Sequence, residues 1–140
     1  MIRLLMAAAL LVASLSASAQ SNISPGMWEY QMETKMKGMP PGMKPMVVRR
    51  CLTPQDVAQN KHLTQGSEKN PCTMSNMKAN GSQIAYEFVC KTDGGTMKGS
   101  TTGTTSATSL EFDTRVQMVP PMEGMSDMQQ KIRAKRVGNC

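Results

Sequence analysis

Strict alternation of apolar and polar side chains is the feature of this 140-residue chain that most constrains its fold. In residues 28–36, large side chains such as Trp28 and Tyr30 take every second position, and charged or amide side chains stand between them. Residues 110–118 repeat the pattern around Phe112. A period of two gives a strand one buried and one solvated face. We therefore expect half-buried antiparallel strands, with Phe112 on the buried face.

Weaker patterns extend this prediction to a whole sheet with one helix. The seven predicted strands span 28–36, 46–52, 72–79, 83–91, 96–105, 110–118 and 131–138. A short helix is expected near 54–62, because Thr53 can cap it and Pro54 suits the first helical position. The predicted fold is mainly β, a single antiparallel meander of about seven strands. Open, half-open and closed barrel forms of the sheet are all compatible with this pattern.

The first 19 residues have the order of a secretory signal peptide. A basic residue precedes an apolar run over 4–13, and small residues then lead to a cleavage site after Ala19. A membrane anchor is the alternative, but the apolar run is about half of the roughly 20 residues that a spanning helix needs. We therefore expect a cleaved signal peptide over 1–19 and a single exported, disulfide-linked domain over 20–140, without a transmembrane segment.

Four cysteines follow the predicted leader, and an even number in a small exported chain predicts two disulfides. A zinc site is the alternative, but no two cysteines have Cys-x-x-Cys spacing. A three-residue loop over 80–82 would place Cys72 opposite Cys90 in a hairpin, which leaves Cys51 to pair with Cys140. A two-residue loop would shift the register by one and turn Cys90 to the other face.

Methionine is unusually abundant. Met1 and Met6 lie in the predicted leader, which leaves 13 of the 15 methionines for the remaining chain. Eight of these 13 lie in two Pro- and Gly-containing segments, 36–46 and 118–128, which we expect to be loops. The two loops meet at one end of the sheet only if the helical connection reverses the direction of the chain.

Soft thioether ligands select Cu(I) or Ag(I), and Met-x-x-Met spacing can present several sulfur atoms to one ion. The candidate ligands are Met36, Met39, Met43 and Met46 in the first segment and Met122, Met125 and Met128 in the second. The alternatives are local packing over the sheet, or an adhesive apolar surface for an envelope protein, a lipid or a peptide.

The sequence offers little for catalysis. His62 is the single histidine, and we expect it on the surface near the helix. There is no glycine-rich phosphate loop and no recognisable catalytic set, so we expect no enzyme and no cofactor other than Cu(I) in the metal alternative. The formal net charge is +6. Export and the scarcity of aromatic residues near the basic strands argue against a nucleic-acid partner.

Six segments of the chain form a recognisable set: Pro25-Gly26-Met27-Trp28-Glu29, the Met/Pro/Gly loop, Val48 to Pro54 with its Cys51-Leu52-Thr53-Pro54, the Cys72 to Cys90 hairpin, Gly95-Thr96-Met97 and the ending Arg136-Val137-Gly138-Asn139-Cys140. Taken together, they resemble a domain-of-unknown-function family of small exported proteins from Gram-negative bacteria. The family's ending usually reads Gly-Asp-Cys, so Asn139 is a departure. The resemblance covers nearly the whole chain after the leader, and it implies a periplasmic, cysteine-containing, β-rich protein without catalytic residues to carry over. We expect a periplasmic, non-catalytic binding or envelope-interaction protein.

Overall fold

The structure is a computed structural model that describes residues 22–40, 42–63, 71–123 and 125–140. For Met122 and Met125 only the backbone is described. The predicted signal peptide over 1–19 lies outside these residues.

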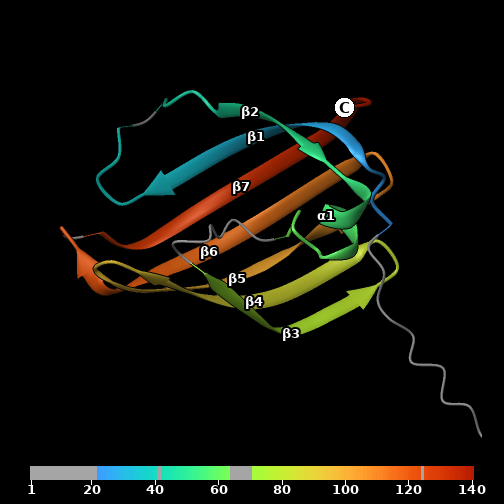
Figure 1. Ribbon diagram of the computed structural model, residues 1–140. Coiled ribbons are helices and arrows are strands. Elements are labelled where there is room, and N and C mark those ends of the chain that lie inside the picture. Colours follow the sequence, from blue (N-terminus) through green and yellow to red (C-terminus); the bar gives the residue numbers. More distant parts are fainter. Residues whose placement is uncertain (1–21, 41, 64–70, 124) are drawn as a thin grey trace, which may run out of the picture.

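The chain forms one seven-stranded antiparallel sheet in the order β2-β1-β7-β6-β5-β4-β3 (Figure 1). The strands are β1 (Gly26–Met36), β2 (Met46–Leu52), β3 (Cys72–Asn80), β4 (Gln83–Thr92), β5 (Gly95–Thr105), β6 (Ser109–Met122) and β7 (Met125–Gly138). The mainly β prediction with seven strands is confirmed. The sheet is strongly bent but not closed, because β2 and β3 are its two edges.

The β3–β4 hairpin has the expected cysteine pairing, but its loop length and its register differ from the prediction. Its loop has two residues and not three, since Asn80 pairs with Gln83. A register shift between Ser75 and Lys78 then adds one residue to β3, so that Cys72 still lies opposite Cys90. A β-bulge of this kind offsets the one-residue shift that a two-residue loop introduces.

The methionine-rich segment 118–128 is not the loop that its prolines suggested. β6 continues to Met122 and β7 begins at Met125, so that two residues join them. The prolines are tolerated because the β6–β7 register jumps from Gln117 to Met122, which leaves Pro120 and Pro121 without a partner in β7. The segment is therefore an extended but irregular end of a hairpin.

The only helix in the described residues, α1 (Pro54–Ala58), is shorter than the predicted 54–62. The Thr53 hydroxyl accepts a hydrogen bond from the Asp56 amide at 3.1 Å, and the Asp56 carboxylate accepts one from the Thr53 amide at 3.0 Å. This capping box fixes the start of the helix. Turns continue the chain from 59 to 63.

Both methionine-rich segments lie at the same end of the sheet, opposite the end at which β2 enters α1 (Figure 1). The connection from β2 to β3 returns the chain to the methionine-rich end, because Cys72 begins β3 there beside Cys90. The register also places Met36 of β1 directly opposite Met128 of β7.

The two faces of the sheet differ as the alternation predicts. The concave face carries the hydrophobic core, in which Trp28 and Leu52 are fully buried and Phe112 is 3% exposed. Leu63, from the connection after α1, packs onto the same core. The convex face carries charged pairs such as Arg49 with Glu29, whose nitrogen and oxygen atoms are 2.9 Å apart.

Candidate functional site

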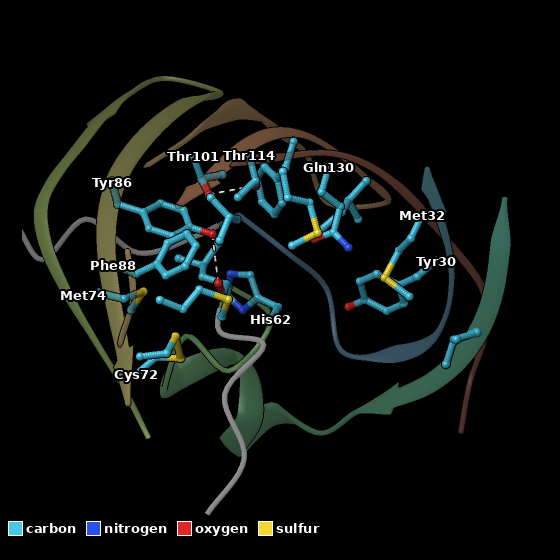
Figure 2. Close-up of a pocket in the computed structure, with 18 of the residues that line it drawn as sticks. Tyr30, Met32, His62, Cys72, Met74, Tyr86, Phe88, Thr101, Thr114 and Gln130 are labelled. Atoms are coloured by element: carbon cyan, nitrogen blue, oxygen red, sulfur yellow. Dashed lines mark hydrogen bonds between the residues drawn. A yellow bond between two sulfur atoms is a disulfide. The ribbon is translucent and has the colours of Figure 1, made fainter. Parts of the chain in front are cut away.

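A pocket of about 340 Å³ lies on the concave face of the sheet (Figure 2). Its floor is formed by Thr101 of β5 and Thr114 of β6, which are register partners at the centre of the sheet. Their hydroxyls hydrogen bond to each other at 2.9 Å, so each has one partner within the protein. The pocket exists because two short side chains meet where larger ones would fill the core.

Aromatic side chains form one wall of the pocket. Phe88 packs over Gly99, where a Cβ atom would overlap the phenyl ring. Tyr86 stands beside Phe88 with ring centroids 6.5 Å apart. The absence of a side chain on Gly99 therefore lets the Phe88 ring approach β5 closely.

Four methionines also line the pocket, one from each of four strands: Met32, Met74, Met97 and Met128. Only Met128 belongs to the predicted metal sets. Methionine side chains are flexible and adapt to ligands of irregular shape. Part of the methionine excess therefore serves the pocket, which the spacing analysis did not reveal.

The segment after α1 covers the pocket. The Tyr86 hydroxyl donates a hydrogen bond to the Leu63 carbonyl at 2.8 Å, which ties this segment to β4. The expectation that His62 is a surface residue is wrong, because it is 7% exposed and lines the pocket. The tertiary contact made by its neighbour Leu63 buries it.

Three polar atoms at the pocket are buried without a hydrogen-bond partner in the described structure. They are the Tyr30 hydroxyl and both ring nitrogens of His62. Burial, together with the nearby charge of Arg50, lowers the pKa of His62 to about 4, so its ring is neutral at pH 7. Burial raises the pKa of Tyr30, an effect that Arg50 partly opposes. Unpaired buried polar atoms are uncommon and require an explanation.

The two disulfides link Cys51 to Cys140 and Cys72 to Cys90, with Cα atoms 5.6 Å and 4.0 Å apart. These are the expected pairs. Cys72 and Cys90 line the pocket, whereas Cys51 and Cys140 do not. One disulfide is therefore part of the candidate site, and the other joins β2 to the end of the chain.

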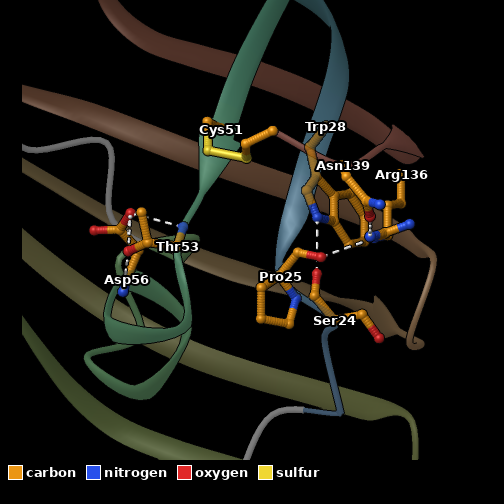
Figure 3. The surroundings of a disulfide bond; sticks show 9 residues. Ser24, Pro25, Trp28, Cys51, Thr53, Asp56, Arg136 and Asn139 are labelled. Atoms are coloured by element: carbon orange, nitrogen blue, oxygen red, sulfur yellow. Dashed lines mark hydrogen bonds between the residues drawn. A yellow bond between two sulfur atoms is a disulfide. The ribbon is translucent and has the colours of Figure 1, made fainter.

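Three of the resemblance motifs meet at a different place, which we call the disulfide corner (Figure 3). It comprises Pro25, Gly26, Trp28, Leu52, Arg136 and the Cys51–Cys140 disulfide. The Trp28 indole donates a hydrogen bond to the Ser24 carbonyl at 3.0 Å. Gly26 has φ +146°, and a Cβ atom there would lie 2.5 Å from Arg136 Nε.

At this corner, Arg136 links the residue before β1 to a residue after β7. Its Nε donates to the Pro25 carbonyl at 2.8 Å, and its terminal nitrogen donates to the Asn139 side-chain oxygen at 2.6 Å. An aspartate at 139 would offer an acceptor oxygen in the same place, which explains why the departure at this position is tolerated. The motifs therefore have structural roles.

The predicted metal ligands are placed only in part. Met36 and Met39 are half-buried and share a turn, in which the Met39 amide donates to the Met36 carbonyl at 3.2 Å. Met43 and Met46 are 62% and 58% exposed. The side chains of Met122 and Met125 lie outside the described part of the structure.

No cluster of three or more His, Cys, Asp or Glu in the described ranges is placed to hold a metal ion. Within the same ranges, no helix has the length and apolar character required to cross a bilayer.

One sequence signal at the pocket was missed. Arg50 follows Val48 and precedes Leu52 at alternate positions, which places its charge on the inward face of β2. Arg50 is exposed on this edge strand, and its alternation with Val48 and Leu52 indicates that its side chain is on the pocket side of β2.

No curated protein and no solved structure matches this chain. A family model does match residues 23–140, and the chain belongs to that family, described as "Protein of unknown function (DUF3617)".

Proposed function

We propose that this protein is a non-catalytic binding protein that holds one small, largely apolar molecule in the concave pocket. The observation that carries the proposal is a mostly apolar cavity. Its lining includes a few buried polar atoms that have no hydrogen-bond partner in the described structure. Ligand sites in proteins combine an apolar lining with a few placed polar groups, and they have volumes of about 300–1,000 Å³. At about 340 Å³, this pocket is at the small end of that range.

Binding explains the site better than catalysis does. A neutral His62 has no described carboxylate within hydrogen-bonding distance to orient it, and the Thr101 and Thr114 hydroxyls bond to each other. A general base needs such an orienting partner, and a nucleophile needs an adjacent base. The groups present can recognise a ligand through hydrogen bonds.

We also propose that the protein works in the periplasm after export. All four cysteines are in disulfides, which persist in oxidising compartments. The leader-like segment before Gln20 supports the same location. Intact-mass measurement of the native protein tests this: the mature chain should begin at Gln20 and carry no free thiol. A retained leader or free thiols would contradict it.

Ligand binding is tested with N-phenyl-1-naphthylamine, a neutral apolar fluorophore whose emission rises in apolar surroundings. The wild-type protein should bind it saturably with one site per chain. Met128→Trp should abolish binding by filling the pocket, whereas the matched control Met43→Trp, at a position 62% exposed, should not. Met97→Trp provides a second filled pocket should Met128→Trp fail to fold. Equal binding by the filled variants and the control would refute the proposal.

Binding of Cu(I) or Ag(I) is a second candidate function, and one observation favours it. Met36 lies opposite Met128 in the register, which brings one member of each predicted set together. Anaerobic Cu(I) titration against a chromophoric chelator tests it. Saturable binding should be lost in the Met36/Met39/Met43/Met46→Leu variant, which removes sulfur and keeps apolar bulk. Equal competition by both proteins would exclude this function.

A further inference from the structure

The unpartnered buried polar atoms of the concave pocket belong to Tyr30 of β1 and to His62 of the segment that covers the pocket. Figure 2 shows the Tyr30 hydroxyl directed from β1 into the cavity, in which the His62 ring also lies. Arg50 of β2 lines the same pocket, and its charge influences both of these residues. A cation and two hydrogen-bonding side chains therefore line one part of a mostly apolar pocket, whose other polar side chains are Tyr86, Thr101, Thr114 and Gln130.

Arg50 carries the one charge in the lining of the pocket, as far as the described residues show. His62 is neutral at pH 7, and the lining contains no carboxylate. The adjacent Arg49 differs, since it lies on the other face of β2 and donates to the Glu29 carboxylate at 3.0 Å. Arg50 has no such ion pair in the described residues, so its charge is available to a ligand.

We infer that the ligand is a single-chain amphiphile with a carboxylate head group, held by Arg50, Tyr30 and His62, with its hydrocarbon chain along the apolar wall. This inference rests on the proposed function and specifies its ligand class. The head group would complete the hydrogen bonding of Tyr30 and His62, which a purely apolar molecule would leave unpaired. Guanidinium and carboxylate form paired, charge-assisted hydrogen bonds.

The rest of the pocket suits one hydrocarbon chain. Phe88 and Tyr86 provide an aromatic wall in which the two rings are inclined at 48°, and the four pocket methionines provide flexible apolar contacts. A volume of about 340 Å³ has room for one chain of moderate length rather than for a lipid with two chains. Size and charge thus point to the same class of molecule.

Displacement of bound N-phenyl-1-naphthylamine by dodecanoate and by dodecanol, below their critical concentrations, tests the inference at pH 7.5. The two ligands share a chain and differ in head-group charge. Wild type should bind dodecanoate at least tenfold more tightly than dodecanol, the size expected for a charge-assisted hydrogen bond. Arg50→Gln should remove this preference, because it weakens the binding of dodecanoate far more than that of dodecanol. Arg49→Gln is the matched control, and it should keep the preference.

The outcomes separate this inference from the proposed function. Equal affinities for dodecanoate and dodecanol, or an equal loss in the Arg49→Gln and Arg50→Gln variants, would overturn the inference while the pocket still binds the fluorophore. Failure of wild type to bind the fluorophore or either ligand would refute the proposed function as well. Tyr30→Phe, which removes one oxygen atom, should weaken dodecanoate several-fold and dodecanol less.

Discussion

The disulfide corner and the concave pocket are built on the same sheet by opposite rules. At the corner, Trp28 is fully buried and its indole nitrogen has a partner, while Arg136 bonds to both ends of the chain. At the pocket, the Tyr30 hydroxyl and the His62 ring are buried without partners. Complete hydrogen bonding of buried polar groups is typical of a part that maintains the fold. Unpartnered polar groups in a cavity support the proposal that the pocket binds a ligand.

This comparison changes how the family motifs are understood. Three of the motifs that carry the resemblance hold the corner together, whereas Cys72, Cys90 and Met97 of the other resemblance segments line the pocket. The family resemblance therefore includes residues of both regions.

Removal of the corner disulfide should cost the most stability. Cys51 and Cys140 are 89 residues apart, against 18 for Cys72 and Cys90. Because longer loops lose more entropy on closure, Cys51→Ser/Cys140→Ser should lower the free energy of unfolding by about 4–5 kcal/mol, and Cys72→Ser/Cys90→Ser by about 3 kcal/mol. Urea denaturation of both double variants measures this.

The same variants also separate stability from binding. The corner variant should retain fluorophore affinity at temperatures where it remains folded, whereas the Cys72→Ser/Cys90→Ser variant should lose affinity because its cysteines line the pocket. The reverse order, with affinity lost only in the corner variant, would contradict the division into two regions.

Truncation of one aromatic residue in each region gives the next largest effect. Trp28→Ala should lower the free energy of unfolding by about 4 kcal/mol, since it leaves a cavity in a fully packed site. Phe88→Ala should cost about 2 kcal/mol, because Phe88 is half-buried beside existing space. Guanidinium denaturation compares them. A larger loss for Phe88→Ala would show that the pocket is a packed part of the core.

Acidification should destabilise the protein through His62. The folded state lowers its pKa from 6.5 to about 4, so the unfolded chain binds the proton more readily between these values. The contribution of a neutral His62 is therefore present above pH 6.5 and lost as the pH falls to about 4. The expected loss is about 2–3 kcal/mol. Tyr30, Arg50 and Tyr86 are the other ionisable groups that line the pocket.

His62→Gln is the control for this titration, measured by urea denaturation at several pH values. The variant should show a much flatter stability profile between pH 6.5 and 4. Asp56 does not interfere, because its capping bonds to Thr53 lower its pKa from 3.8 to about 2, and its contribution is lost below that window. Identical profiles for wild type and His62→Gln would contradict the burial of a neutral ring.

Local pattern predicted most of the sheet because one physical rule governs it. The period of two placed Phe112 and Thr114 on the inner face, and the inner face is buried in the structure. The cysteine pairs followed from hairpin register, although a bulge in β3 and a two-residue loop together produced the predicted result. The predicted loop length was wrong and the bulge was not predicted, and these two errors cancel in the register of the hairpin.

The pocket was not predictable in the same way. Its hollow depends on Thr101 and Thr114 meeting across β5 and β6, which requires the register of strands whose turn type was unknown. The burial of His62 depends on the contact between Tyr86 and Leu63, residues 23 positions apart. Tertiary contacts of this kind have no periodic signal. The alternation of Arg50 with Val48 and Leu52 on β2 was the sequence feature that could have indicated a residue of the pocket.

The methionine methyl groups offer the most direct test of the pocket as the ligand site. Spectra of methyl-¹³C-methionine-labelled protein, assigned by single Met→Leu substitutions, are recorded with and without N-phenyl-1-naphthylamine. We predict ring-current shifts for the four pocket methionines, Met32, Met74, Met97 and Met128, and none for the exposed Met43, Met46 and Met77. Shifts confined to the exposed methionines, or no shift at all, would contradict the account.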